Sequence, residues 1–377
     1  MSARSGDVEG LVRRDLLRLK EYQPVNPPEV LSERAGIPVS ELIKLDGNEN
    51  PYGCSPRVGR ALAGYPWFHT YPDPEQREVR QALERYTGIG AGHIVAGAGS
   101  DDLIDLVLRL FLERGDRVIN CPPTFGMYQF CTEVCGGEVV DVPRDASFAI
   151  DTAAIRGAVD QKTKVVFIAS PNNPSGNVTD TGAILELLQT GLVVVVDEAY
   201  YEFSGVTVAP LVPQHHNLIV LRSMSKWAGL AGLRIGYGIF PEYVARHLLK
   251  IKQPYNVNLA AQVALVESLA DIDYLQGTVR AIIAERERLT ARLGGLGYLT
   301  VWPSQANFVL CSVERGEARH IHQRLGERGI SLRYFDAPRL ENAIRISVGR
   351  PEHTDALIAA LEGLGPGTTF RHPAEGR

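Results

Sequence analysis

Residues 219–239 read IVLRSMSKWAGLAGLRIGYGI and combine an apolar run with a glycine-rich segment. The apolar run 219–221 predicts a buried strand, which ends at Ser223, Ser225 and Lys226. Arg234 follows eight residues after the lysine. Burial would lower the pKa of the lysine amine and make it a nucleophile toward a carbonyl, while the hydroxyls and the guanidinium could hold a phosphate. For this stretch alone, an exposed lysine in a glycine-rich loop is an equal alternative.

Length, composition and charge are those of an ordinary globular protein. The 377 residues predict two domains, or one large domain with a smaller partner, and a hydrophobic content of 45% allows a sizeable core. A net charge of -5 gives no reason to expect nucleic acid or an anionic membrane as a partner. The N-terminus lacks the apolar segment of a signal peptide, and no run reaches the roughly 18 apolar residues of a membrane span.

The cysteines and histidines suggest neither a disulfide framework nor a metal site. The five cysteines are scattered without a CxxC pair, a pattern that favours free thiols in a reducing cytoplasm: Cys54, Cys121, Cys131, Cys135 and Cys311. Cys131 and Cys135 could share a helix face but have no second ligand pair nearby, and His320 and His322 would lie on different sides of a helix. We therefore expect no metal ligands.

Strand and helix patterns alternate along residues 93–223. Apolar runs at 94–97, 117–121, 138–142, 164–169, 192–197 and 217–222 read as strands, with helical patterns at 103–116, 124–137 and 181–189. The run 193–196 is apolar without interruption, as expected for a strand covered on both faces in a parallel sheet. The sequence therefore predicts an α/β fold with a mostly parallel sheet in a large domain.

A second pattern follows residue 240. A long helical region at 260–293 leads to strand-like segments at 299–313, 330–335 and 342–349, with helices at 318–329 and 352–364. This predicts a smaller α+β domain. We expect an N-terminal arm at 1–45, part of it joining the small domain, the large domain at 46–262, the small domain at 263–364 and a disordered tail at 365–377.

Polar residues follow several predicted strands, where ligands of α/β sheets bind. The segment GAGSDD at 97–102 enters a helix whose free N–H groups suit a phosphate, with Ser100 as a candidate N-cap; an ordinary capped turn is the alternative. Phe125 could cover a flat ring or belong to the core. Asn173 ends a strand in the turn SPNNPSG, where plain turn chemistry would also explain it.

A purely structural role explains Asp197 less well than it explains the preceding residues. It ends the run 193–196, where a buried carboxylate is costly unless it meets a positive charge. It could hold a protonated pyridine nitrogen, while Asn173 and Tyr200 bond a phenolate oxygen. A helix N-terminus with serines and an arginine could hold a phosphate ester, and Lys226 could form an imine. These features together describe a site for pyridoxal phosphate.

Four motifs in order, NPSG, DEAY, SxSK and GLRIGY, resemble those of the class I/II, fold-type I aminotransferases, and the resemblance covers nearly the whole chain. Within that group the chain is most similar to the histidinol-phosphate aminotransferases, through LKEYQP, KLDGNENPYG, SPNNPSG, DEAYYEF, SQANFVL and IRISVG. The resemblance implies transamination between L-histidinol phosphate and 2-oxoglutarate, giving imidazole-acetol phosphate and glutamate in histidine biosynthesis.

The resemblance also implies a role for each matching residue. Lys226 would form the imine and later move a proton at the substrate, Asp197 would pair with the pyridinium nitrogen, and Phe125 would stack on the ring. Asn173 and Tyr200 would bond the ring oxygen. The cofactor phosphate would be surrounded by Gly99, Ser100, Asp101, Ser223, Ser225 and Arg234, together with Tyr71 of the neighbouring subunit in a homodimer.

The substrates would be bound mainly by the small domain and the N-terminal arm. Arg345 would bind a carboxylate by a bidentate pair, Arg333 and Tyr22 would face the distal phosphate or side-chain carboxylate, and Asn173 would also contact the substrate. The chain departs from the family at Phe125, where tyrosine is usual, and at GAGSDD, where NGSDE or GADE is common. Both changes bear on the choice of substrate rather than on the reaction type.

Three alternatives share part of this evidence. Two lie within the same fold, an aromatic amino acid aminotransferase and a threonine-phosphate decarboxylase. The third is a regulatory protein that binds the cofactor without turnover, which predicts no change in cofactor absorbance when an amino donor is added. A nucleotide site at GAGSDD is disfavoured because the spacing is not GxGxxG.

Overall fold

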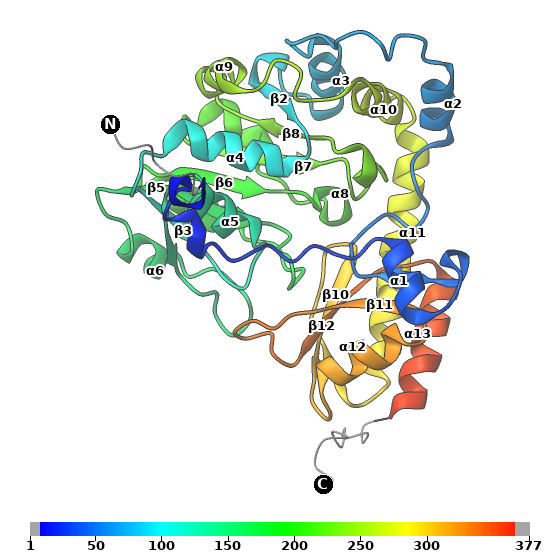
Figure 1. Cartoon of the computed structure of the whole chain (residues 1–377). Helices are drawn as coiled ribbons and strands as arrows, with labels where there is room; N and C mark the ends of the chain where they lie inside the picture. Colours follow the sequence, from blue (N-terminus) through cyan, green and yellow to red (C-terminus); the bar gives the residue numbers. More distant parts are fainter. Residues whose placement is uncertain (1–7, 366–377) are drawn as a thin grey trace.

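The computed structural model describes residues 8–365 and contains two β-sheets joined by a long helix (Figure 1). Of the tail predicted at 365–377, all but Gly365 lies outside the described residues. The helices are α1 (Pro28–Ala35), α2 (Pro56–Gly64), α3 (Arg77–Thr87), α4 (Ser100–Phe111), α5 (Met127–Val134), α6 (Thr152–Gly157), α7 (Thr181–Leu188), α8 (Tyr201–Ser204), α9 (Glu242–Ile251), α10 (Leu259–Leu269), α11 (Ile272–Gly294), α12 (Ala318–Gly326) and α13 (Pro351–Leu364). Short 3-10 helices span Val8–Leu11, Leu16–Arg18, Val39–Glu41, Ala91–His93, Ala209–Gln214 and Ala231–Leu233.

The large domain is built on a seven-stranded sheet with the order β2-β8-β7-β6-β5-β3-β4. Its strands are β2 (Ile94–Gly97), β3 (Arg117–Asn120), β4 (Glu138–Asp141), β5 (Thr163–Ala169), β6 (Val193–Asp197), β7 (Leu218–Ser223) and β8 (Gly236–Ile239). The pairs β4–β3, β3–β5, β5–β6 and β6–β7 are parallel, whereas β8 pairs antiparallel with both β7 and β2. This confirms the predicted α/β class with a mostly parallel sheet.

Helices cover both faces of this sheet, as the uninterrupted apolar run at 193–196 predicted. Val194 and Val196 pack into one cluster with residues of α3, α7 and α10, whereas Val195 packs into the opposite cluster with residues of α4, α5 and α9. Successive side chains of a strand point to opposite faces, so both faces need apolar residues. The functional residues are therefore confined to the strand ends.

The small domain contains a five-stranded sheet with the order β1-β11-β12-β10-β9. Its strands are β1 (Ile43–Leu45), β9 (Leu299–Val301), β10 (Phe308–Val313), β11 (Ile330–Tyr334) and β12 (Ala343–Ser347). β1 of the N-terminal arm pairs parallel with β11, while β11, β12, β10 and β9 pair antiparallel. Helices α11, α12 and α13 pack beside this sheet (Figure 1). The arm thus becomes an edge strand of the last domain in the sequence.

The domain boundary expected from the sequence lies between residues 262 and 263. It falls inside α10, which packs against α2 and α3 of the large domain. The helical region predicted at 260–293 is in fact two helices, with a break between Leu269 and Ile272. Asp271 in this break accepts a hydrogen bond from the hydroxyl of Ser55, at the start of α2. We propose that the chain leaves the large domain at this break.

Several further findings concern membranes, metals and thiols. Within residues 8–365, no helix has both the length and the apolar character needed to cross a membrane. In the same part of the chain, no three His, Cys, Asp or Glu side chains are grouped so that they could hold a metal ion. All five cysteines are free thiols.

Candidate active site

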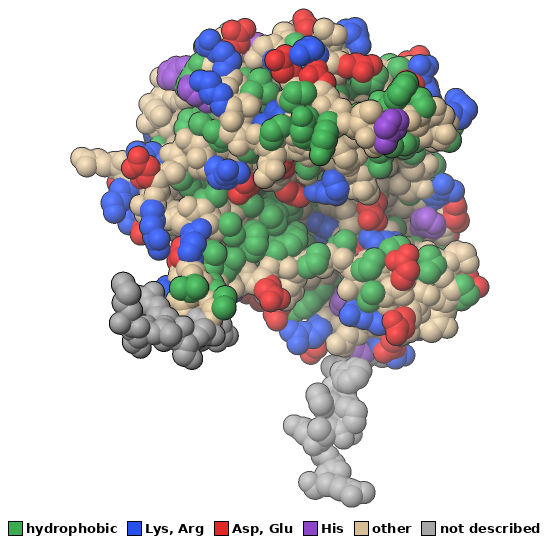
Figure 2. All heavy atoms as spheres, turned by 45° about the horizontal axis from the view of Figure 1, so that its top comes forward, with side chains coloured by type: hydrophobic (Ala, Val, Ile, Leu, Met, Phe, Trp, Pro, Cys, Tyr) green, Lys and Arg blue, Asp and Glu red, His purple; other side chains and the backbone are tan. Residues whose placement is uncertain are grey.

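A cavity of about 820 Å³ lies where the carboxyl ends of β3, β5, β6 and β7 face the small domain. Figure 2 shows the surface hollowed between the two lobes of the molecule, with hydrophobic side chains along the hollow. Most residues singled out in the sequence line this cavity: Tyr22, Ser100, Asp101, Phe125, Asn173, Asp197, Tyr200, Ser223, Ser225, Lys226, Arg234, Arg333 and Arg345. Gly99 and Tyr71 do not line it, although Gly99 lies beside Arg234, which does.

Lys226 follows β7 and points into the cavity. Its Nζ donates a hydrogen bond of 3.0 Å to the carbonyl of Gly47, in the loop after β1. Burial lowers the pKa of the amine from 10.5 to about 8, and the positive charges of Arg345 and Arg234 act in the same direction. A larger fraction of this lysine is therefore neutral at physiological pH than of an exposed lysine, as a nucleophile or a base requires.

Asp197 ends β6 and lines the same cavity. Its Oδ2 accepts a hydrogen bond of 2.7 Å from the hydroxyl of Tyr128, and its Oδ1 accepts one of 3.0 Å from the amide of Ala199. Burial raises the pKa of the carboxyl from 3.8 to about 6. No salt bridge reaches Asp197 from residues 8–365. This buried carboxyl is thus suited to a positively charged partner that enters with a ligand.

The loop after β1 supports the same wall, through Asn48. The Nδ2 of Asn48 donates to the hydroxyl of Tyr200 at 2.9 Å, and its backbone carbonyl accepts from Asn307 at 2.9 Å. Ser347 of β12 donates to the Oδ1 of Asn48 at 2.9 Å. Asn48 has a positive φ of 53°, which asparagine tolerates better than most residues. Burial raises the pKa of Tyr200 to about 12, so its hydroxyl remains a proton donor.

A cradle for an anion lies between the start of α4 and the loop that carries Arg234. The N-cap of α4 is Gly99, with a φ of 86°, and Ser100 is the first helical residue, so the prediction of Ser100 as N-cap is wrong. A Cβ on Gly99 would lie 2.6 Å from Nη2 of Arg234, and one on Gly236 would lie 2.7 Å from the amide nitrogen of Ser100. Only glycine allows both approaches, which leave the helix N-terminus beside the guanidinium.

Charges and hydroxyls complete this cradle. Arg234 is held by a salt bridge of 2.9 Å to Asp101. Ser223 accepts a hydrogen bond of 3.1 Å from the amide of Ser225, so both serines lie in one tight turn. Backbone N–H groups at a helix start, hydroxyls and a guanidinium are the groups that bind a phosphate ester. These residues therefore fit the phosphate of the predicted cofactor.

Two arginines from adjacent strands form the opposite wall. Arg333 of β11 and Arg345 of β12 are directly paired in the antiparallel register. Arg345 donates to Oδ1 of Asn173 at 2.6 Å and to the carbonyl of Asp46, while its buried Nε has no partner among the described residues. Arg333 donates to the carbonyl of Gln23 at 2.7 Å. The free Nε and the paired guanidinium groups leave donors for an anionic substrate.

Aromatic rings close the cavity beside these arginines. Tyr22 of the N-terminal arm meets Phe125 edge-on, with ring centroids 6.4 Å apart. Phe125 in turn meets Tyr128 edge-on at 5.6 Å. A flat ring bound in front of Asp197 would have these aromatic side chains as neighbours.

Tyr71 lies apart from the other predicted residues. Its side chain is 80% exposed and stacks on Tyr255 at a centroid distance of 4.5 Å and an interplanar angle of 16°. Trp67 and Phe68 in the same segment are 57% and 50% exposed. An exposed aromatic surface of this kind is typical of a protein interface.

Three residues that contact the site were missed from the sequence: Gly47, Asn48 and Tyr128. The first two lie in the motif KLDGNENPYG, whose residues carry no chemical signal of their own. Tyr128 lies three residues after Phe125, close to one turn along the same segment. That spacing was the available signal for Tyr128.

Comparisons with known proteins agree with this geometry. Residues 40–361 match the family model described as aminotransferase class I and II, a region that contains both sheets. The chain is 48% identical to the histidinol-phosphate aminotransferase of Dehalococcoides mccartyi, over 94% of this chain and 98% of that protein. It is 44% identical to the chloroplastic histidinol-phosphate aminotransferase of Nicotiana tabacum, over 94% of this chain and 86% of that protein. The crystal structure of the histidinol-phosphate aminotransferase from Sinorhizobium meliloti in complex with pyridoxal-5'-phosphate superposes with a TM-score of 0.84 at 29% identity, over 92% of this chain and 96% of that one.

Proposed function

The chain belongs to the class I and II aminotransferases, and from this premise we propose that it transfers the amino group of L-histidinol phosphate to 2-oxoglutarate. The products would be imidazole-acetol phosphate and glutamate, as in histidine biosynthesis. The observation that carries the choice of substrates is the pairing of Arg333 with Arg345 on adjacent strands. One substrate bears a phosphate and the other two carboxylates, and two neighbouring guanidinium groups can bind either. The similarity to the relatives above supports the same donor.

The enzyme is a pyridoxal-phosphate-dependent aminotransferase, and its cavity fits that cofactor. When bound, the cofactor supplies a carbonyl that exchanges amino groups and a ring that withdraws electrons from the substrate. Asp197 is a buried carboxyl suited to the protonated ring nitrogen. Tyr200 and Asn173 face the ring oxygen in this assignment, and Phe125 covers the ring. The glycine cradle at Gly99 accepts the phosphate.

Lys226 has two tasks in this assignment. As a neutral amine it would hold the cofactor through the carbonyl that the cofactor supplies. As a base, the same amine would take the proton from the substrate carbon that bears the amino group. A pKa lowered to about 8 suits both tasks, because the amine then changes protonation state near working pH.

Arg345 and Arg333 orient the substrates. Arg345 is held by Asn173 and Asp46, so its guanidinium is fixed in place before a ligand arrives. Its unpartnered Nε supports a bond to a substrate carboxylate. Arg333 and Tyr22 lie farther from Lys226 in this assignment and receive the distal phosphate of the donor or the side-chain carboxylate of the acceptor.

The direct test measures glutamate formed by the purified protein from 2-oxoglutarate and L-histidinol phosphate. Parallel reactions use L-tyrosine and O-phospho-L-threonine as alternative amino compounds. Glutamate formation with the highest kcat/KM for L-histidinol phosphate supports the proposal. No glutamate, a preference for tyrosine, or carbon dioxide release from phosphothreonine would each overturn it.

We expect Arg333→Gln to raise KM for L-histidinol phosphate by about 10- to 100-fold, since a hydrogen bond to a charged group contributes roughly 1.5–3 kcal/mol. The kcat should change less, because Arg333 does not contact the reacting carbon. Arg319→Gln is the control, as Arg319 is another small-domain arginine that pairs with Asp336 outside the cavity. An unchanged KM in the Arg333 variant would contradict the assignment.

We also infer that the enzyme is a homodimer in which Tyr71 of the partner subunit binds the cofactor phosphate. The exposed aromatic surface formed by Trp67, Phe68, Tyr71 and Tyr255 supports this inference. Tyr71 is too exposed to be explained by the core of its own subunit.

A subunit-mixing experiment tests the dimer. Tyr71→Phe should weaken cofactor binding about 10-fold through the lost hydroxyl, and Lys226→Ala should be inactive. In a hybrid dimer, one site combines an intact Lys226 with an intact Tyr71 from the other subunit. After free exchange, about a quarter of the sites should regain wild-type cofactor affinity and activity. A mixture that shows only the sum of the two variants would exclude sharing of the site.

A further inference from the structure

A second set of buried polar residues lies directly behind the active-site residues at the ends of β6 and β7. Asp197 and Ser223 line the cavity, whereas their chain neighbours Glu198 and Arg222 do not. The two strand ends are joined, because the amide of Glu198 donates 2.8 Å to the carbonyl of Leu221. Successive side chains of an extended chain point to opposite sides. Each of the two cavity residues is therefore bonded through the backbone to one residue of the pair behind it, Asp197 to Glu198 and Ser223 to Arg222.

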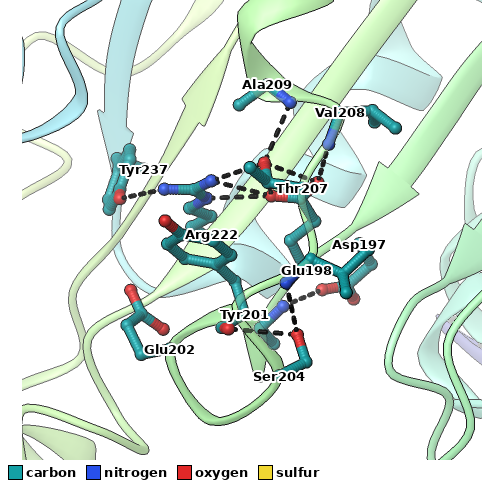
Figure 3. Close-up of polar contacts among 12 residues, drawn as sticks. Asp197, Glu198, Tyr201, Glu202, Ser204, Thr207, Val208, Ala209, Arg222 and Tyr237 are labelled. Atoms are coloured by element: carbon teal, nitrogen blue, oxygen red, sulfur yellow. Dashed lines mark hydrogen bonds and ion pairs between the residues drawn. The ribbon is translucent and has the colours of Figure 1, made fainter. Parts of the chain in front are cut away.

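Glu198 and Arg222 form an ion pair that is almost completely buried. Nε and Nη2 of Arg222 lie 3.0 and 2.9 Å from Oε2 of Glu198, and the two side chains are 4% and 2% exposed. Figure 3 shows the guanidinium of Arg222 between Glu198, Thr207 and Tyr237. The two charges belong to neighbouring strands, so the pair fixes the position of one strand end relative to the other.

Every polar atom of this pair is engaged by surrounding groups. The hydroxyl of Thr207 lies 2.7 Å from both Nη2 of Arg222 and Oε2 of Glu198. The amide of Val208 donates 2.8 Å to Oε1 of Glu198. The guanidinium also lies 3.7 Å above the ring of Tyr201, which directly follows Tyr200 of the cavity. Three cavity residues, Asp197, Tyr200 and Ser223, thus each have a covalent neighbour in this buried network.

Stability alone gives a weak reason for such a pair. Removing two charges from water costs several kcal/mol, and apolar residues of similar volume often serve equally well or better. A fully bonded pair does, however, hold the two strand ends in a single relative position, with less freedom than apolar contacts allow. Here that position sets where the Asp197 carboxylate and the Ser223 hydroxyl stand.

We propose that Arg222 and Glu198 are positioning residues, which hold Asp197 against the cofactor ring nitrogen and Ser223 against the cofactor phosphate. The proposal rests on the function proposed above, because it takes Asp197 and Ser223 to be cofactor ligands. It assigns to the pair no contact with cofactor or substrate. Its effect is transmitted through the backbone of two adjacent strand ends.

The experiment compares the single variants Arg222→Met and Glu198→Gln with the double variant Arg222→Met/Glu198→Leu. Each single variant leaves a buried partner unpaired and should lower the melting temperature of the apoprotein. The double variant removes both charges and should regain most of that loss. Arg222→Lys keeps the charge without the forked geometry and serves as the conservative variant if others fold poorly.

The decisive readouts are the dissociation constant for pyridoxal phosphate, titrated into apoprotein by absorbance, and the pH midpoint of the bound chromophore. We expect the double variant to bind the cofactor about 10- to 100-fold more weakly despite its recovered stability, a range known for supporting residues at metal sites. The pH midpoint should also shift, because Asp197 no longer stands at its position beside the ring. Arg222→Lys should lie between wild type and the double variant.

Asn217→Ala is the matched control at the other end of the same strands. Asn217 is buried, precedes β7 and donates to the carbonyls of Leu188 and Leu192, far from the cavity residues. It should lower stability without changing cofactor affinity. A double variant with wild-type affinity and an unchanged pH midpoint would overturn the positioning role alone. A wild-type protein that neither binds the cofactor nor forms glutamate would overturn the proposed function, and the positioning role with it.

Discussion

Replacing Lys226 with alanine should lower steady-state glutamate formation by at least about 10³-fold, because in the proposed assignment this amine both holds the cofactor and moves the proton at the substrate carbon. The fold should persist. Burial lowers the pKa of this amine to about 8, so its protonated form costs folding free energy at neutral pH, and alanine removes that cost. Some cofactor affinity should remain through the phosphate cradle and Asp197.

The control for this prediction is Lys252→Ala. Lys252 is also buried and has a lowered pKa, but it bonds the carbonyls of Gln253 and Pro254 and does not line the cavity. Its variant should keep wild-type turnover, even where stability falls. Wild-type turnover in Lys226→Ala, measured as the initial rate with both substrates, would refute the role of Lys226.

The second large effect is expected for Asp197→Asn, which should lower turnover by about 10²- to 10³-fold, because in the proposed assignment the ring nitrogen would lose its charged partner. The same substitution should raise the stability of the apoprotein, although it lowers turnover. The folded-state pKa of about 6 lies above the ordinary 3.8, so the native protein binds more protons than the unfolded chain between these values. Stability of the wild-type apoprotein therefore falls as pH rises through that window, and stays lower above it.

Asparagine cannot ionise and avoids this loss. Above pH 6 the variant apoprotein should be more stable than wild type by on the order of 2–3 kcal/mol, and near pH 3.8 the difference should vanish. Urea unfolding of the two apoproteins across this pH range measures it. Asp160→Asn is the control of opposite sign, because hydrogen bonds and Arg117 lower the pKa of the exposed Asp160 carboxyl. A less stable Asp197→Asn apoprotein at pH 8 would contradict the burial argument.

The fold could be predicted from the sequence because its main signals are local. The apolar run 193–196 and the alternation of strands and helices are read within a few residues, and they lead directly to a parallel sheet covered on both faces. The break at Asp271 could not be read in this way. Helical periodicity continues across it, and the partner of Asp271 is Ser55, more than 200 residues away.

The candidate site was predictable to the extent that it lies at strand ends. Asp197 and Ser223 end parallel strands and Lys226 follows one of them, and the carboxyl ends of these strands must meet at one edge of the sheet. Asn48 carries no such signal, because its bond to Tyr200 joins positions 152 residues apart. The N-cap of α4 depends on a left-handed backbone angle at Gly99, which the motif GAGSDD allows but does not specify.

The pairing of β1 with β11 has a consequence for the order in which the protein assembles during synthesis. Ile43 pairs with Ile330, and Asn48 reaches Ser347 across 299 residues, so β1 has no strand to pair with until nearly the whole chain has left the ribosome. The seven-stranded sheet needs only residues 94–239 and can form earlier. The catalytic cavity is therefore expected to close last, when the end of the chain returns to its beginning.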